Sequence, residues 1–199
     1  MRLRGPMMSW GDHSRFTVRD SRREPTKSGV IGLLCSALGR PRWQSVTDLT
    51  ALKMGVRVNK EGVLLCDYHT VQEVVYHTGK GDSTVLSNRY YVADGDYLVG
   101  LEGQDLEFLT QLNQALRTPV WQLYLGRKSF VPSLPVAAGV VDLPLPEALR
   151  SYPCDYSLGR LRHVLETPES LDVRQDVPLS WQKRLFGSRC VETNYWEVE

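Results

Sequence analysis

An amphipathic helix with marked ends is the feature that most constrains the fold of this chain. The segment PTKSGVIGLLCSALG places Thr26 where it can cap a helix N-terminus and Gly39 where a helix typically stops. Between them, apolar residues recur at helical spacing, at Val30, Ile31, Leu33, Leu34, Ala37 and Leu38. The pattern predicts a helix over 26–39 with one face in the core and a polar N-terminal mouth.

The segments on either side of this helix predict an α+β fold. The expected elements are a strand at 1–4 that leads into a turn at 5–11, the helix at 26–39, a short helical stretch near 48–54, strands at 56–58, 63–66, 89–93 and 97–101, and a helix at 105–116. Asp94-Gly95 is a strong hairpin signal between the last two strands. The order strand, helix, strands, helix, strand is that of a ferredoxin-like fold, which RNA-recognition modules (RRM) share.

Two segments depart from this regular pattern. Residues 68–88 combine β-branched residues with glycines and have no helical stripe, which predicts a protruding, flexible hairpin. The part after 125 is rich in proline, and its short β-like runs at 160–166 and 190–198 predict a small irregular sheet packed on the first half. We therefore expect a domain at 1–125 with an insertion at about 68–88, and a β-rich region at 126–199.

Positive charge gathers toward the N-terminal end of the chain. Residues 1–42 hold nine basic and three acidic side chains, so their net charge is +6, although the whole chain carries only +1. This asymmetry is typical of proteins that bind a phosphate backbone. A solvated, mobile loop from Asp12 to Glu24 explains the same charges without a ligand, and composition leaves both interpretations open.

The mouth of the first helix is a candidate anion site. Lys27, Ser28 and Gly29 form its first turn, where free backbone amides and the helix dipole favour negative charge. Many helices begin in this way and bind nothing. The segment lacks the Gly-x4-Gly-Lys pattern of a nucleotide triphosphate loop, so we do not expect ATP.

The cysteines and histidines indicate no metal and no cofactor. Cys35, Cys66, Cys154 and Cys190 include no Cys-x-x-Cys pair, and the four histidines show no ligand spacing. We expect reduced cysteines, with Cys35, Cys66 and Cys190 buried in apolar segments. No apolar run approaches the roughly 18–20 residues of a membrane span, and no leader is evident, so we expect a cytoplasmic protein with no membrane contact.

Four segments together resemble one protein family over nearly the whole chain. They are LRGPMMSWG (3–11), PTKSGVIGLLCSALG (25–39), DYHTV (67–71) and YLGRKSFVPSLPV (124–136). In order and spacing they resemble the Cas5 family of CRISPR-associated proteins, within the RAMP superfamily, in the form found in type I-E Cascade surveillance complexes. That family usually has several more residues of first strand before the turn at 5–11.

The resemblance implies a fold, a function and partners. The implied fold is a ferredoxin-like domain with a thumb-like β-hairpin at 68–88 and a small C-terminal β region. The implied function is to cap the 5′ handle of CRISPR RNA without cutting it. The implied partners are this RNA, the backbone subunit and the large subunit of the complex, with target DNA reached only through the complex.

The resemblance and the charge pattern together assign the RNA-binding residues. Glycines in the first turn let backbone approach a ligand, an indole can stack on a base, and a basic glycine turn can hold phosphate. The residues expected at the RNA are Gly5, Trp10, Arg15, Arg19, Arg22, Arg23, Lys27, Ser28, Tyr68, His69, Thr70, Arg89, Gly126, Arg127 and Lys128.

Two other functions remain as alternatives. A related subtype uses its Cas5 protein as a metal-independent endoribonuclease that processes CRISPR repeat RNA, and Tyr68, His69 and Lys27 are residue types suited to that reaction. The sequence places no second histidine and no carboxylate to orient His69, so we expect no catalytic residue and a protein that is not an enzyme. A general protein-interaction domain is the third possibility, but it leaves the basic glycine turns unexplained.

Overall fold

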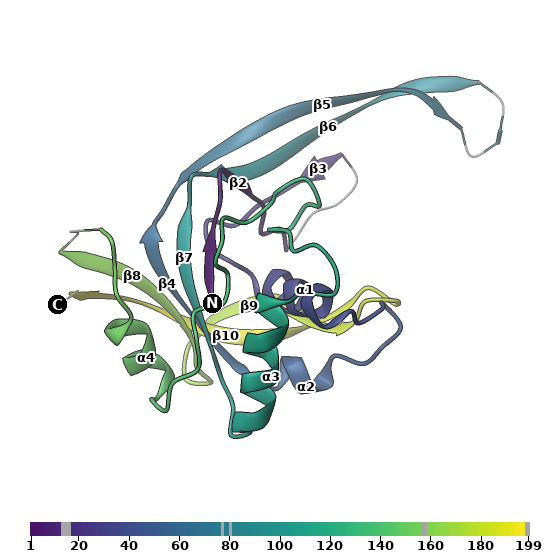
Figure 1. The fold of residues 1–199 in the computed structure, drawn as a ribbon. Helices are drawn as coiled ribbons and strands as arrows, with labels where there is room; N and C mark the ends of the chain where they lie inside the picture. The colour runs from purple at the N-terminus through teal and green to yellow at the C-terminus, as the bar shows by residue number, and fades with distance from the viewer. Residues whose placement is uncertain (13–16, 77, 80, 157–158, 198–199) are drawn as a thin grey trace.

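One antiparallel sheet forms the body of the molecule (Figure 1). The computed structural model describes residues 1–12, 17–76, 78–79, 81–156 and 159–197. Within these residues the sheet has six strands, which are, in spatial order, β1 (Arg2–Arg4), β7 (Asp96–Glu102), β4 (Lys53–Lys60), β8 (Arg160–Glu166), β10 (Leu185–Glu197) and β9 (Asp172–Ser180).

Part of this sheet, with two helices, has ferredoxin-like topology. The elements β1, α1 (Lys27–Leu38), β4, β7 and α3 (Leu106–Arg117) follow one another along the chain, and β7 lies between β1 and β4, antiparallel to both. The segment 133–136 takes the place of the fourth strand, since two backbone hydrogen bonds of 2.8 and 2.7 Å join it to Arg2 and Arg4. The predicted α+β, ferredoxin-like class is confirmed.

The helix ends lie where local capping chemistry places them. At the start of α1 the side chain of Thr26 accepts a hydrogen bond from the amide of Gly29, and at its end Gly39 adopts a left-handed φ of 68°. At the start of α3 the carboxylate of Asp105 accepts from the amide of Phe108 at 2.9 Å. Both predicted helices are therefore confirmed, whereas the stretch predicted at 48–54 is a shorter helix, α2 (Thr47–Thr50), because β4 begins earlier than expected.

Helices cover both faces of the sheet. Val56 of β4 belongs to the large core that also contains residues of α1 and α3. The neighbouring Gly55 faces α4 (Leu145–Ser151) on the opposite side, where an added Cβ would come within 2.9 Å of Leu149. The alternation along β4 thus separates a main core from a smaller one beneath α4.

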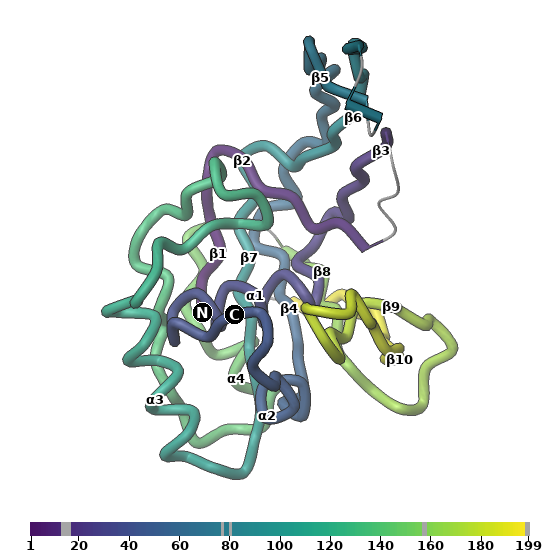
Figure 2. The backbone as a smooth tube through the Cα atoms, turned by 90° about the vertical axis from the view of Figure 1, so that its right-hand side faces the viewer, coloured from purple at the N-terminus to yellow at the C-terminus, as the bar shows by residue number. Residues whose placement is uncertain are grey.

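A long two-stranded ribbon, the thumb, projects from the body (Figures 1 and 2). It consists of β5 (Val63–Val75) and β6 (Asp82–Ala93), paired antiparallel from Val63 opposite Ala93 to Val75 opposite Asp82. The short strands β2 (Met7–Met8) and β3 (Val18–Arg19) pair with the base of β6. The thumb predicted at 68–88 is present but longer, because the runs at 63–66 and 89–93 are its base and lie outside the main sheet.

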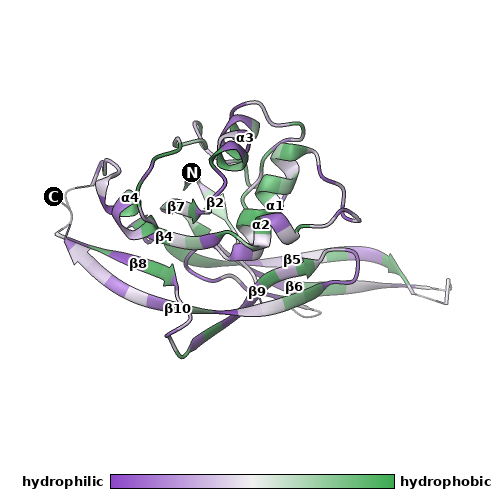
Figure 3. Cartoon of the chain, turned by 90° about the horizontal axis from the view of Figure 1, so that it is seen from below, coloured by the Kyte–Doolittle hydropathy of each residue, from purple (hydrophilic) through white to green (hydrophobic). Residues whose placement is uncertain are grey.

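Beyond its base, where Val92 of β6 belongs to the main core, the thumb is largely open to solvent on both faces. Val71, Val75 and Leu86 are 38, 64 and 43% exposed, and Figure 3 shows hydrophobic stretches along both strands. Cys66 is exposed on β5, so its predicted burial is wrong: an apolar pattern does not lead to burial on a strand that stays uncovered along almost its whole length. All four cysteines are free, and Cys35 is buried as expected.

The C-terminal strands continue the main sheet. β8 pairs with β4, with Val164 opposite Val56, and β10 then pairs with β8 and β9. The expectation of a separate small sheet is therefore wrong. In a four-stranded ferredoxin-like sheet β4 would be an edge strand with unpaired backbone groups, and β8 uses these groups to extend the sheet.

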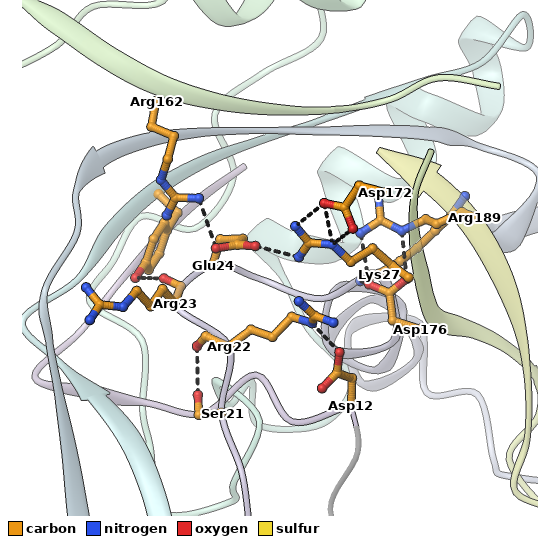
Figure 4. A network of polar contacts seen from close by, with 12 residues as sticks. Asp12, Ser21, Arg22, Arg23, Glu24, Lys27, Arg162, Asp172, Asp176 and Arg189 are labelled. Atoms are coloured by element: carbon orange, nitrogen blue, oxygen red, sulfur yellow. Dashed lines mark hydrogen bonds and ion pairs between the residues drawn. The ribbon is translucent and has the colours of Figure 1, made fainter. Parts of the chain in front are cut away.

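A buried ionic cluster fixes the start of α1 against these C-terminal strands (Figure 4). The ammonium group of Lys27 lies 3.0 Å from both carboxylate oxygens of Glu166 and is only 2% exposed. Asp176 accepts from the backbone amide of Lys27 at 2.8 Å and from the guanidinium of Arg189 at 2.7 and 2.8 Å. Burial alone would raise the pKa of Asp176, but Arg189 outweighs this effect and holds the pKa below its usual value.

A second group of charges holds the chain just before α1. Glu24 accepts from Arg174 at 2.7 Å and from Arg162 at 3.0 Å, and Arg162 also bonds both carboxylate oxygens of Glu61 at 2.6 and 2.7 Å. Glu24 is 7% exposed, so its charge is compensated inside the protein. The two groups together connect residues 24–27 with β8, β9 and β10.

Replacing Lys27 by methionine should destabilise the fold. We expect the Lys27→Met variant to lose about 3 kcal/mol of unfolding free energy, the lower end for removal of one partner of a buried pair, since Glu166 keeps the amide of Met54 and Arg189 nearby. The double variant Lys27→Met/Glu166→Leu should recover most of this loss. Urea unfolding measures both, with the exposed Lys53→Met as the matched control, and an unchanged midpoint for Lys27→Met would contradict a structural role.

Candidate nucleic-acid interface

An open groove of about 1270 Å³ lies between the base of the thumb, α1 and the turn between β9 and β10. Its floor is an unusually bare face of α1, made of Ser28, Gly29, Gly32, Cys35 and Ser36. The loops at 40–43 and 121–128 supply further lining residues. Segments from widely separated parts of the chain therefore meet at one surface.

The charges that line the groove are mostly positive. In the part of the chain that the structure describes, seven basic side chains belong to the lining: Arg19, Arg40, Arg42, Arg89, Arg127, Lys128 and Arg184. The lining carboxylates among the described residues are Asp12 and Asp20. Arg40 is neutralised by Asp48, at 2.5 and 2.7 Å, but the excess of cations remains and favours a polyanion.

Arg127 lies near Arg89 and Arg19, which are paired across β6 and β3. Arg127 donates to the carbonyl of Tyr90 at 2.7 Å, which fixes its guanidinium at the thumb base. Burial lowers the pKa of Arg127, and the charges of Arg89 and Arg19 lower it further, while Asp67 acts in the opposite direction. A bound phosphate would relieve the repulsion among the arginines.

The basic glycine turn at 126–128 depends on a glycine in the left-handed conformation. Gly126 adopts a φ of 86°, and a Cβ there would lie 1.8 Å from the carbonyl oxygen of Ser9. The amide of Ser9 also bonds the carbonyl of Leu125 at 3.0 Å, so the turn is held against the first turn of the chain. Glycine is required at position 126 because the backbone of Ser9 passes so close to it. The two residues that follow, Arg127 and Lys128, line the groove.

Lys27 is not where the sequence analysis expected it. Its prediction as an exposed phosphate ligand is wrong, because its ammonium is buried against Glu166 and its amide is bonded to Asp176. A carboxylate of the protein itself therefore occupies the helix mouth. Ser28 is half-buried, bonds Thr26 at 3.3 Å and does line the groove.

Gly5 and Trp10 also serve the core and do not reach the groove. Trp10 is 1% exposed, and its ring leaves so little room beside α1 that a Cβ at Gly29 would lie 2.8 Å from it. Gly5 is buried, with an added Cβ 3.1 Å from Leu125. The predicted stacking of the Trp10 indole on a base is therefore wrong, since the ring has no free face.

The arginines before α1 have different positions. Arg19 lies on β3 and lines the groove, whereas Arg22 is paired with Asp12. Arg23 is exposed and its carbonyl accepts from Tyr97. Arg15 lies outside the described residues. The described part of this stretch is tied to the body through β3 and a bridge between Trp10 and Arg22, so it is not the free loop of the alternative interpretation.

Tyr68, His69 and Thr70 lie on the thumb, outside the groove lining. Neighbouring residues of a strand point to opposite faces, so Tyr68 and His69 cannot face one phosphate together. The Nδ1 of His69 lies 3.6 Å from a carboxylate oxygen of Asp67, which the sequence analysis did not assign to it. The spacing of two residues in a strand was the signal that could have found this pair.

Aromatic residues of the groove were missed by sequence reasoning. Trp43, Trp121, Trp181 and Phe186 all belong to the lining, and they come from three separate segments. No local pattern links these segments. Only the sheet extension through β8 to β10 carries Trp181 and Phe186 to α1.

The described residues offer little sign of other kinds of site. They contain no group of three or more histidine, cysteine or acidic residues arranged to hold a metal ion. Among the helices of that part of the chain, none has the length and apolar character that crossing a membrane requires.

Comparisons with known proteins agree on one family. The family model described as CRISPR-associated protein (Cas_Cas5) matches residues 1–192. The CRISPR system Cascade subunit CasD of Escherichia coli (strain K12) is 32% identical over 171 residues, which covers 76% of this chain and 75% of that protein.

Two solved structures share the fold over almost the whole chain. One, described as "Crystal structure of Cas protein", is 43% identical with a TM-score of 0.80 and covers 98% of this chain and 93% of its own. A chain of a "CRISPR RNA-guided surveillance complex" is 32% identical with a TM-score of 0.85, covering 100% of this chain and 89% of its own. The chain therefore belongs to the Cas5 family of CRISPR-associated proteins.

Proposed function

We propose that this protein is a CRISPR RNA-binding subunit of a Cascade surveillance complex and that the groove holds the 5′ handle of the RNA. The observation that carries the proposal is the excess of cations in the groove, above all Arg19, Arg89 and Arg127, which lie close together at the thumb base. These three arginines form what we call the phosphate wall of the groove, and phosphates placed along it would compensate their charges. The E. coli relative is a Cascade subunit by name, which supports the same role.

The thumb is the element best suited to hold neighbouring subunits. Its two strands expose apolar side chains on both faces, among them Val63, Tyr68 and Val75, which are 59, 64 and 64% exposed. An exposed apolar ribbon of this kind is typical of a surface that a partner chain covers. We assign the thumb to contacts with the backbone and large subunits of the complex, and target DNA would meet the protein only through that assembly.

The geometry supports binding without cleavage. The nuclease alternative needs Tyr68, His69 and Lys27 at one scissile phosphate. Lys27 is buried in an ion pair, while Tyr68 and His69 point to opposite faces of the thumb. Asp67 can orient the imidazole, but a base without a second group to stabilise the developing charge does not complete a catalytic site.

Removing single charges from the groove should weaken RNA binding in a salt-dependent way. We expect Arg89→Gln and Lys128→Gln each to lower affinity for a labelled RNA that carries the CRISPR repeat 5′ handle, by about 1–3 kcal/mol for a lost charge-assisted contact. The slope of log affinity against log salt should fall by about 0.7 for each lost phosphate contact. Filter binding at several salt concentrations measures both quantities.

The control for this prediction is Arg117→Gln. Arg117 is exposed at the end of α3 and does not line the groove, so the same loss of charge there should leave affinity and slope unchanged. Equal effects of all three variants would show that binding depends on net charge alone and would refute the groove. An unrelated RNA of the same length tests whether the repeat sequence matters.

Shortening the thumb should prevent assembly but not folding. Replacing residues 74–83 by a short glycine linker removes the tip of the ribbon, which no other described element pairs with. We expect unchanged thermal unfolding of the isolated protein and loss of the variant from complexes pulled down with the other Cascade subunits. Recovery of the complete complex at normal yield would show that the tip is dispensable.

Incubation with labelled repeat RNA should give binding and no cleavage. We expect a shifted band and no product, with or without magnesium, over hours at neutral pH. The discriminating variants are His69→Ala and Tyr68→Phe. A discrete fragment that disappears in either variant would establish the nuclease alternative.

A further inference from the structure

Tryptophans gather in the part of the groove that lies over the C-terminal half of α1. Three of the five tryptophans of the chain line it, and Trp43 and Trp121 are 79 and 47% exposed. The amide of Trp121 donates to the carbonyl of Ser36 at 3.0 Å, which fixes its backbone to the helix. Trp181 comes from the turn between β9 and β10 of the main sheet and lies beside Gly32.

Gly32 has no packing reason to be glycine. An added Cβ there would meet nothing closer than Trp181, at 4.0 Å, whereas at Gly29 the ring of Trp10 lies 2.8 Å away. Glycine in the interior of a helix is less favourable than alanine by about 1 kcal/mol. Gly32 therefore leaves a bare patch of helix surface, open toward the groove and next to an indole ring, at a cost in stability.

Cationic side chains lie in the same groove as this patch and could hold phosphates. Arg42 and Arg184 line the same groove and are both exposed. Aromatic faces interleaved with guanidinium groups suit single-stranded nucleic acid, because unpaired bases stack on the rings while phosphates lie on the cations. A base-paired duplex offers no free base faces to such a surface.

We propose that Trp121, Trp181 and the bare helix surface at Gly32 form a base-stacking compartment for unpaired nucleotides of the bound RNA. The inference rests on the proposed function and extends it, since it divides the groove in two. Phosphates lie along the wall of Arg19, Arg89 and Arg127, and bases enter beside Gly32, where a side chain would take their place. The protein should therefore select single-stranded RNA.

The decisive variant is Gly32→Leu. Because the site is open and leucine is a better helix former than glycine, we expect a melting temperature equal to or above that of the unchanged protein. Affinity for a fluorescein-labelled single-stranded RNA carrying the repeat 5′ handle should fall about tenfold, as expected for one lost stacking interaction. Trp121→Ala, which removes a ring that stands at the surface, should give a loss of similar size.

Matched probes distinguish stacking from general disturbance of the groove. Gly32→Ala adds one methyl group and should raise the melting temperature with a smaller loss of affinity than Gly32→Leu. RNAs with one abasic nucleotide at each position in turn should identify the stacked bases. At those positions the abasic RNA should bind the unchanged protein more weakly, and Gly32→Leu should cause no further loss.

The outcomes separate this inference from the proposed function. If Gly32→Leu and Trp121→Ala bind as tightly as the unchanged protein while Arg89→Gln binds more weakly, the compartment is refuted and the phosphate wall stands. Equal affinity for the single strand and for its duplex also refutes the compartment. If the unchanged protein binds none of the RNAs above the level of an unrelated protein, both proposals fail.

Discussion

The ionic cluster at the start of α1 is the interaction on which the rest of the structure depends. Lys27 bonds Glu166 and Asp176, and Arg189 bonds the same two carboxylates, so that one point of the N-terminal half meets three strands of the C-terminal half. A buried ion pair of this kind adds little net stability over apolar packing, but a mismatched arrangement would leave charges buried without partners. The cluster thus favours one register of α1 against β8, β9 and β10, and residues of α1 and of the turn between β9 and β10 both line the groove.

The same cluster explains why Lys27, at the start of α1, is not available to bind a phosphate. Asp176 accepts from the amide of Lys27 and takes the place near the helix dipole that an anion would otherwise fill. The positive charge of the groove then has to come from other segments. It comes from β3, from the base of the thumb and from the turn at Gly126, which are held next to α1 by the fold and not by their order in the chain.

What the sequence predicted well is local, and what it missed depends on distant contacts. The ends of α1 follow from Thr26 and Gly39, which are close in sequence to the groups they cap. The pairing of β8 with β4 joins residues about a hundred positions apart, and no periodic pattern records it. The expected burial of Cys66 failed for the same reason, since burial depends on whether another element packs on the strand.

The candidate site divides in the same way. Arg19, Arg89, Gly126, Arg127 and Lys128, which were predicted to contact RNA, line the groove. A long charged side chain on a turn or at the base of a projecting ribbon tends to reach solvent. Gly5, Trp10 and Lys27 belong to the core instead, and their residue types alone could not show it. The residues that were missed are brought to α1 by long-range packing, Trp121 through the loop after α3 and Trp181 through the turn between β9 and β10.

The large sequence separation between Lys27 and its partners also bears on the order in which the chain folds during synthesis on the ribosome. Synthesis proceeds from the N-terminus, so α1 emerges well before Glu166, Asp176 and Arg189 have been made. During that interval Lys27 has no carboxylate to meet it, whereas β5 and β6 can already pair because they are neighbours in sequence. The thumb strands can therefore pair early, whereas the groove, which needs the turn between β9 and β10, can form only after the C-terminal strands have been made.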